Sequence, residues 1–177
     1  LLKIKGKKMK YSRKQFIEKL IEHEGCVLTV YQDSLGIDTI GIGRNLQDRG
    51  ISPEELAQME TSIEDIHDKG ITEADAIYLA ENDVQIVEDE LSKAHPCVER
   101  LDAVRQLILM DMAYNMGVPR LCKFKNMWRN IHKAVEADIK KEKFFRAASL
   151  EMLDSKWARQ VKSRAKKMAI AMRSGEF

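Results

Sequence analysis

The sequence predicts a mostly helical α+β fold with two lobes. A small N-terminal lobe holds a β-hairpin, and a long helix joins it to an all-α C-terminal lobe. Two observations favour this class: strand-like alternation occurs only over residues 26–45, and apolar residues elsewhere recur at three-and-four spacing. Hydrophobic residues make up 44% and charged residues 33% of the 177 residues, which is typical of globular rather than disordered chains. No apolar run reaches the roughly 20 residues of a membrane-spanning helix.

The first helix is expected to start at Ser12, which has capping-box spacing with Gln15, and to end at Gly25. The basic segment before it, residues 1–11, lacks the apolar stretch of a signal peptide. We interpret it as a leader or fusion remnant, with Met9 as a candidate start, and leave it out of the fold. The apolar stripe of the helix comprises Phe16, Ile17, Leu20 and Ile21.

A hairpin follows. VLTVYQD (27–33) and TIGIGRN (39–45) have strand character, and the DSLGID segment between them is rich in turn residues. Alternation in the second strand places Ile40 and Ile42 on one face. The other face carries Thr39, Gly41 and Gly43 and is nearly bare, so a bulky ligand could approach its backbone.

The remainder is expected to be helical. Ser52-Pro53 is a strong helix start, and Thr72 caps a connecting helix over 72–93 that separates the lobes 12–71 and 94–177. A helix over 101–116 is apolar on nearly all sides and should be central to the core. Shorter amphipathic helices follow around Trp128, over 144–153 and over 163–173. The stripe of the connecting helix comprises Ile77, Ala80, Val84, Val87 and Leu91.

Charge is strongly uneven along the chain. Residues 1–20 carry 8 basic and 1 acidic residue, residues 21–119 carry 6 and 21, and residues 120–177 carry 16 and 6. Basic ends could attract a polyanion, either nucleic acid or an anionic cell wall, or could be an ordinary solvated surface. The odd number of cysteines (Cys26, Cys97 and Cys122) favours reduced thiols, and the four histidines have no metal-ligand spacing.

Glu24 and Asp33 are the candidate catalytic pair. Glu24 continues the apolar stripe in the last turn of its helix, where partial burial and the helix dipole both favour the neutral acid. Such an acid can protonate a leaving oxygen, although a helix-end Glu turned to solvent is the alternative. Asp33 ends the first strand, and glycosidases need a second, charged carboxylate beside the acid. The hydroxyl of Thr39, on the bare face, could hold a water.

These residues carry a family resemblance. The stretch HEG-x5-Y-x-D-x5-TIGIGRN resembles the catalytic segment of the phage-type lysozymes, and 101–117 and 155–165 resemble the family's central helix and C-terminal signature. The resemblance implies the lysozyme fold and an N-acetylmuramidase that cleaves bacterial peptidoglycan. Glu24 would be the general acid, while Asp33 and Thr39 would activate the attacking water in an inverting scheme. No cofactor or metal is implied.

Other positions carry over from the same resemblance. Arg164 matches the arginine that pairs with the catalytic Glu, and Tyr114 and Asn115 match residues that line the cleft near Trp157. For Trp157 the alternative is a core position, and for Arg164 a solvated base. Two positions depart from the family pattern. Arg44 stands where family members often have His after TIGIG, and His23 stands where an acidic residue commonly precedes the catalytic Glu. With the adjacent Gly43, Arg44 is expected near the cleft, where it would bind anionic glycan or Asp33, unless the family His is only structural.

Two alternatives to a hydrolase remain. One is a cell-wall-binding or virion structural module without turnover. The other is a nucleic-acid binder that uses the basic C-terminal lobe, but no nucleic-acid-binding motif supports it, and we expect no nucleic-acid partner. The resemblance implies a monomeric phage endolysin without a membrane span. We expect it in the host cytoplasm before it reaches the wall, or as part of a larger virion or fusion protein.

Overall fold

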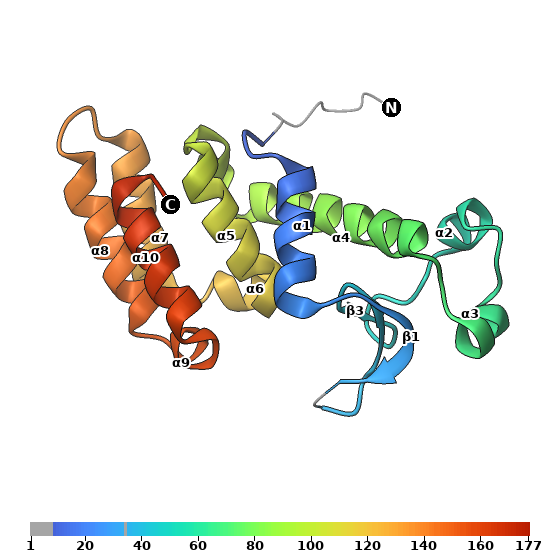
Figure 1. Cartoon of the computed structure of the whole chain (residues 1–177). Helices are drawn as coiled ribbons and strands as arrows, with labels where there is room; N and C mark the ends of the chain where they lie inside the picture. Colours follow the sequence, from blue (N-terminus) through green and yellow to red (C-terminus); the bar gives the residue numbers. More distant parts are fainter. Residues whose placement is uncertain (1–8, 34) are drawn as a thin grey trace, which may run out of the picture. The chain divides into compact units, whose positions relative to one another are not determined.

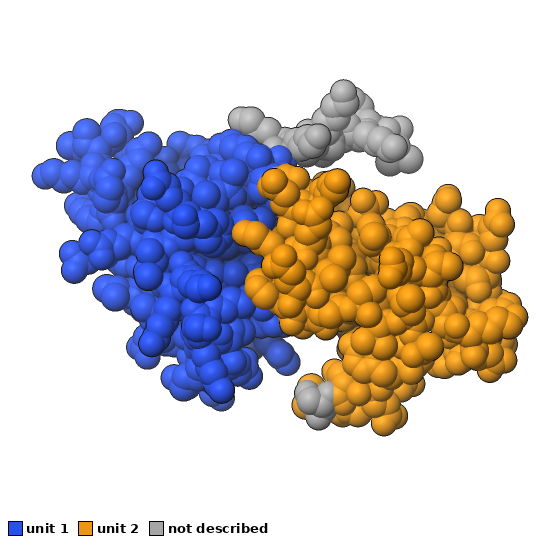
Figure 2. Space-filling model, in the orientation of Figure 1, with its two compact units in different colours: residues 1–11, 86–177 blue, residues 12–85 orange. Residues whose placement is uncertain are grey.

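A computed structural model describes residues 9–33 and 35–177 and confirms a mostly helical fold with one small antiparallel sheet (Figure 1). The chain divides into two compact units. Unit 1 comprises residues 1–11 and 86–177, and unit 2 comprises residues 12–85, so the division falls inside helix α4 (Glu73–Ala94) (Figure 2). The first eight residues of the expected leader lie outside the described residues.

Unit 2 begins with α1 (Arg13–Glu24), which has the bounds that the sequence predicts. The hydroxyl of Ser12 accepts a hydrogen bond from the backbone N–H of Gln15 at 3.3 Å and caps the helix. The helix ends where Gly25 adopts a φ of 77°, a conformation that favours glycine. The expected stripe is confirmed, because its buried members are Phe16, Ile17 and Leu20.

The sheet has three strands in the order β1 (Val27–Gln32), β2 (Asp38–Gly41) and β3 (Arg44–Asn45). The expected hairpin of β1 and β2 is confirmed, with Tyr31 opposite Thr39. The prediction of one continuous strand over TIGIGRN is wrong, since the chain turns at residues 42–43 and returns as β3. Positive φ angles at Gly41 (65°) and Gly43 (75°) make this turn, and a pattern of alternating residues does not reveal it.

Two short helices follow, α2 (Pro53–Gln58) and α3 (Ile63–Lys69). A full capping box of Ser52 and Glu55 starts α2, as the sequence predicts. Helix α3 packs on β1, where the N–H of Ile71 donates to the carbonyl of Leu28 at 2.8 Å. A Cβ at Gly70 would lie 2.2 Å from that same carbonyl oxygen, so only glycine permits this contact.

Helix α4 starts after Thr72, whose hydroxyl accepts from the N–H of Asp75 at 3.1 Å. Ile77 was expected in its buried stripe, but its side chain is 41% exposed and Ala76 is buried instead. Ile77 lies at the edge of the stripe, where three-and-four spacing does not distinguish buried from exposed positions. The other expected members are all buried: Ala80, Val84, Val87 and Leu91.

Unit 1 is helical after α4, as predicted. The elements are η1 (Pro96–Arg100), α5 (Ala103–Met116), α6 (Val118–Leu121), α7 (Lys125–Glu136), α8 (Lys141–Leu153), α9 (Lys156–Val161) and α10 (Ser163–Ser174). Helix α10 packs against α5, α8 and α9, and α8 also packs against α7. Helix α5 is central, because its fully buried side chains include Ile108, Leu109, Met110 and Met112. Among the described residues, no helix combines the length and apolar character that a bilayer span requires.

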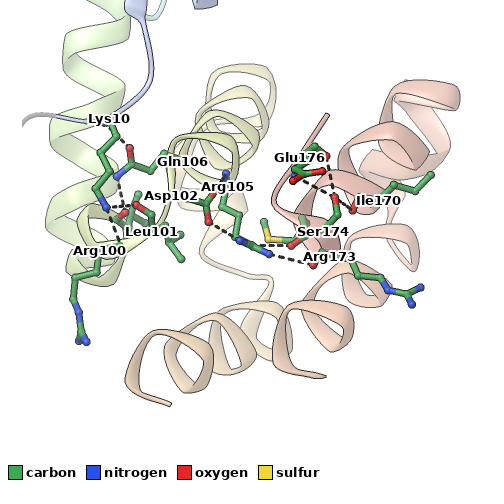
Figure 3. Close-up of polar contacts among 12 residues, drawn as sticks. Lys10, Arg100, Leu101, Asp102, Arg105, Gln106, Ile170, Arg173, Ser174 and Glu176 are labelled. Carbon is green, nitrogen blue, oxygen red and sulfur yellow. Dashed lines mark hydrogen bonds and ion pairs between the residues drawn. The ribbon is translucent and has the colours of Figure 1, made fainter. Parts of the chain in front are cut away.

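Polar contacts fasten Lys10 and the C-terminal end of α10 to the start of α5 (Figure 3). The backbone N–H of Lys10 donates to the side-chain oxygen of Gln106 at 2.7 Å, so residues 9–11 belong to the folded unit 1 and the expectation that they lie outside the fold is wrong. The buried guanidinium of Arg105 donates to the carbonyls of Met172 at 2.8 Å and Arg173 at 3.1 Å (Figure 3). It thereby satisfies carbonyl groups that the end of α10 would otherwise leave unpaired.

Candidate active site

Glu24 is the last residue of α1, next to the glycine that turns the chain into β1. Its side chain is exposed, so the expectation of partial burial on the apolar stripe is wrong. The stripe ends with Leu20, since Glu24 lies in the final turn, where no further residue of the helix covers it. Glu24 therefore stands at the surface of unit 2, at the junction of the helix and the sheet.

Asp33 directly follows β1 and organises the hairpin loop. Its Oδ1 accepts hydrogen bonds from the backbone N–H groups of Leu35 at 2.7 Å and Ile37 at 3.0 Å. This is the loop-closing role that aspartate often has at turns. Within the described part of the chain, no residue hydrogen-bonds the second oxygen, Oδ2. Asp33 thus combines a fixed orientation with one carboxylate oxygen that is available to a ligand.

Thr39 lies on β2, and its side chain is only 4% exposed. The expectation that it lies on a bare face is wrong, because the face of a strand that lacks bulky residues of its own can still be covered by other segments. The hydroxyl donates its proton to the carbonyl of Ile37 at 3.0 Å. Its lone pairs remain as acceptors for a hydrogen of a water or a ligand.

Tyr31 lies close to the candidate residues, and the sequence analysis did not single it out. It is paired with Thr39 across the hairpin, so these two side chains share one face of the sheet, and it precedes Asp33 by two residues. Burial raises the pKa of its phenol, and the negative charges of Glu24 and then Asp33 raise that pKa further. Both carboxylates therefore lie within electrostatic reach of one phenol. The sequence signal that could have pointed to Tyr31 is the Y-x-D part of the motif, in which Tyr31 stands two residues before Asp33.

The two glycines of the β2–β3 turn differ in what surrounds them. A Cβ built on Gly41 would contact Ala76 of α4 at 3.5 Å, so this glycine faces protein and not a ligand. A Cβ on Gly43 would meet nothing within 4 Å, and the residue is exposed. Only Gly43 therefore remains available to an approaching ligand.

Arg44 does not occupy the position that its sequence neighbours implied. Its side chain is 3% exposed and donates to Oε1 of Glu55 from Nη1 at 2.9 Å and from Nη2 at 2.7 Å. Its Nε lies 3.5 Å from a carboxylate oxygen of Asp83. The expectation that Arg44 binds glycan or Asp33 is wrong, because two buried acids from α2 and α4 already engage it. Its role is to support unit 2 from inside.

The remaining candidates belong to unit 1. Trp157 is 4% exposed and is a core residue, whereas Tyr114 is half-buried and Asn115 is exposed at the end of α5. Arg164, at the start of α10, forms an ion pair with the buried Asp111 of α5. The sequence did not point to Asp111 as a partner of this arginine. The expected pairing of Arg164 with Glu24 stays a prediction.

The cysteines are free thiols, as the sequence predicts. Cys97 has its Sγ 3.7 Å from Nε2 of His132. Burial raises the pKa of the Cys97 thiol to about 11, so this thiol is protonated at neutral pH and is a weak nucleophile. The Cys97–His132 pair therefore does not provide a second nucleophilic centre.

Comparison with protein families decides the relationship. The family model for phage lysozyme matches residues 21–167, which include Glu24, Asp33 and Thr39 and every other candidate residue. The chain belongs to the phage lysozyme family. Its carboxylates at the end of α1 and after β1 are thus residues of a lysozyme-family domain.

Two curated relatives show how the family domain is used in different proteins. The chain is 30% identical over 170 residues to the pre-baseplate central spike protein of Enterobacteria phage T4, covering 90% of this chain and 28% of the spike protein. It is 25% identical over 162 residues to the probable T4-type lysozyme 1 of Dictyostelium discoideum, covering 86% of this chain and 89% of that protein. The phage lysozyme domain of this chain thus spans little more than a quarter of the first relative and most of the second.

Proposed function

We propose that this phage lysozyme family member is an N-acetylmuramidase. It would hydrolyse the β-1,4 bond between N-acetylmuramic acid and N-acetylglucosamine in bacterial peptidoglycan. Glu24 would protonate the leaving glycosidic oxygen, and Asp33 with Thr39 would hold the attacking water. A glycosidase needs this division of work, because one carboxyl group must give up a proton while the other accepts one.

The observation that supports this proposal is that Tyr31 pairs with Thr39 across the hairpin while Glu24 and Asp33 both act electrostatically on its phenol, all within unit 2. Asp33 presents Oδ2 as an acceptor, and Thr39 presents its lone pairs. A water that both residues orient would lose a proton to Asp33 as it attacks. The exposed position of Glu24 leaves its carboxyl accessible to a polymeric substrate.

We propose inversion as the stereochemical course. A single displacement needs room for a water, with roughly 6.5–9.5 Å between the carboxyl groups, whereas a retaining enzyme brings them to about 5–5.5 Å. The hydrogen bonds of Asp33 to the hairpin loop favour a fixed base over a nucleophile that must reach the sugar. Proton NMR of the first product formed distinguishes the two courses, because inversion releases the α-anomer and retention the β-anomer.

Three residues of unit 1 would assist cleavage of the glycan. Arg164 would orient the carboxyl group of Glu24, and Tyr114 with Asn115 would contact the glycan. The accessibility of Tyr114 and Asn115 at the end of α5 supports this role. Trp157 is left out of the contacting set, because it is buried in the core of unit 1.

The charge of unit 1 supports an anionic substrate. Bacterial walls carry peptide carboxylates and polymer phosphates, so an exposed basic surface raises the rate of encounter with them. Helices α7 to α10 and their connections expose many bases, among them Arg129, Lys133, Lys140, Lys141, Lys143, Arg146, Lys156, Arg159, Lys162, Lys166, Lys167 and Arg173.

The test compares the wild type with Glu24→Gln on purified peptidoglycan, with Glu22→Gln as the control. Glu22 is an exposed acid on the same helix, so its variant carries the same change of charge. Loss of the general acid should reduce the rate by roughly 10²–10⁴. Mass spectrometry should find products with reducing muramic acid ends from the wild type and from Glu22→Gln. Equal cleavage by Glu24→Gln would reject Glu24 as the acid.

A second candidate function is a wall-binding or virion structural module without turnover. The similarity to the phage T4 spike protein favours a virion setting, while the match over 89% of the Dictyostelium lysozyme favours an enzyme that acts as a single domain, as an endolysin released from the host cytoplasm would. Sedimentation with peptidoglycan without release of any fragment would identify the binding module. Detection of the protein in purified virions rather than only in lysates would identify the virion setting.

A further inference from the structure

The four side chains of the candidate site differ in the hydrogen-bonding capacity that they have left. Asp33 offers an acceptor, Oδ2, and its other oxygen is held by the loop. Thr39 has committed its proton to the carbonyl of Ile37 and can only accept. The proton of Glu24 is assigned to the leaving oxygen in the proposed reaction. Three of the four groups therefore supply either acceptors or a proton that the reaction consumes.

Tyr31 is the exception. In the described part of the chain, no residue accepts a hydrogen bond from its phenol, although the residue is half-buried on β1 opposite Thr39 of β2. Burial raises the pKa of this phenol, and the charges of Glu24 and then Asp33 raise it further. The phenol therefore stays protonated and remains a donor throughout the neutral pH range.

The proposed substrate carries a group that needs such a donor. N-acetylated sugars present an acetamide whose carbonyl oxygen only accepts hydrogen bonds. A carboxylate repels that oxygen, whereas sugar hydroxyl groups can donate to Asp33 or to Thr39. A donor that lies opposite Thr39 and two residues before Asp33 therefore selects an acceptor on the glycan.

We infer that Tyr31 is a substrate-binding residue whose phenol donates a hydrogen bond to the acetamide carbonyl of the sugar bound beside Glu24 and Asp33. The inference rests on the proposed function, since it assumes that an N-acetylated glycan occupies this site. It assigns the preference for N-acetylated sugar to a named residue of the β-hairpin. A site built around this donor disfavours a sugar that lacks the carbonyl, because the phenol is then left without its acceptor.

The test measures binding in the Glu24→Gln background, so that cleavage does not interfere. Calorimetry with soluble peptidoglycan fragments compares Tyr31→Phe with the unmodified tyrosine, and Tyr78→Phe, a half-buried tyrosine of the same unit, is the control. Loss of one neutral hydrogen bond should weaken binding about 3- to 10-fold. Chemically de-N-acetylated fragments should bind weakly to both proteins, and the affinities of Tyr31→Phe and of the protein with Tyr31 intact should then be equal.

The outcomes are separable. The inference is overturned if Tyr31→Phe and the protein with Tyr31 intact bind N-acetylated fragments with equal affinity. It is also overturned if the loss of affinity caused by Tyr31→Phe persists with de-N-acetylated fragments. If Tyr31→Phe does not fold, the protein with Tyr31 intact still decides the question, because equal binding of the two kinds of fragment rejects a contact with the acetamide. Failure of the wild type to release fragments from peptidoglycan would reject the proposed function through a different measurement, and undiminished cleavage by Glu24→Gln would reject Glu24 as the acid.

Discussion

Arg44 and Glu55 form a buried pair in which both terminal nitrogens of the guanidinium donate to one carboxylate oxygen, at 2.9 and 2.7 Å. The other carboxylate oxygen of Glu55 accepts from the backbone N–H of Ser52 at 2.8 Å and completes the capping box of α2. Asn82 of α4 also donates to Glu55, at 2.9 Å. The pair therefore ties β3, the start of α2 and the middle of α4 together within unit 2.

Replacement of Arg44 by Gln should strongly destabilise the protein. The change leaves the carboxylates of Glu55 and Asp83 buried without their shared cation, and breaking a buried pair in this way costs about 3–5 kcal/mol of unfolding free energy. Urea unfolding monitored by circular dichroism measures it. Arg49→Gln is the control, because that side chain is 32% exposed and its ion pair with Asp83 should contribute at most about 1 kcal/mol. Similar losses from both variants would contradict the buried-network account.

Asp83 should give the stability a distinct pH dependence. Burial raises its pKa to about 6 despite the opposing charges of Arg44 and Arg49. The folded protein therefore holds this proton more tightly than the unfolded chain, so the contribution of Asp83 to stability falls as pH rises from about 4 to about 6. The total change is on the order of 2–3 kcal/mol. Asp83→Asn should abolish this pH-dependent contribution. The measurement is the unfolding free energy of the wild type minus that of Asp83→Asn, followed from about pH 4 to about pH 6. A difference that stays flat would contradict it.

Asp33→Asn and Asp33→Ala should separate the loop-closing role of this residue from its chemistry. Asn keeps a side-chain oxygen for the N–H groups of Leu35 and Ile37, so stability should change by less than about 0.5 kcal/mol while the cleavage rate falls by roughly 10²–10⁴. Ala removes both hydrogen bonds and should in addition lower the free energy of unfolding by about 1–2 kcal/mol. Thermal unfolding and turbidity clearing of cell walls provide the two readouts. Near-normal clearing by Asp33→Asn would exclude the carboxylate from the reaction.

The ionisation of Tyr31 should report the charges of its neighbours. Because the negative charge of Glu24 raises the pKa of the Tyr31 phenol more than that of Asp33 does, Glu24→Gln should lower this pKa further than Asp33→Asn does. Tyrosinate absorbance followed against pH, with the Tyr31→Phe spectrum subtracted, isolates the residue from the other tyrosines. An unchanged titration in both variants would mean that the carboxylates do not lie near this phenol.

Cleavage of intact walls should fall as salt is added. The basic surface of α7 to α10 acts at a distance, and screening at high ionic strength removes that attraction, so a loss on the order of 10-fold is expected. Lys166 and Lys167 replaced together by Gln should weaken the salt dependence more than Lys14 and Lys69 replaced together, because only the first pair lies on that surface. Rates measured in turbidity assays from low to high salt test this. Salt-independent clearing by the wild type would argue against it.

Several features could be predicted from the sequence because their causes lie within a few residues. Ser12, Ser52 and Thr72 start helices through hydrogen bonds that span three residues, and Gly25 ends one through its backbone conformation. The 101–116 segment is apolar on nearly all sides, so its central position follows from composition alone. The motif that carries Glu24, Asp33 and Thr39 likewise predicts a candidate triad, through its resemblance to the phage-type lysozymes.

Only the tertiary structure decided which side chains are covered and by what. Arg44 is buried because Glu55 and Asp83, 11 and 39 positions away, surround it, and no local pattern encodes that meeting. Thr39 is buried although its strand face carries little bulk, and Glu24 is exposed although it continues an apolar stripe. Tyr31 became a candidate only through its pairing with Thr39. Capping and periodicity act along the chain, whereas burial and electrostatic contact depend on residues that folding brings together.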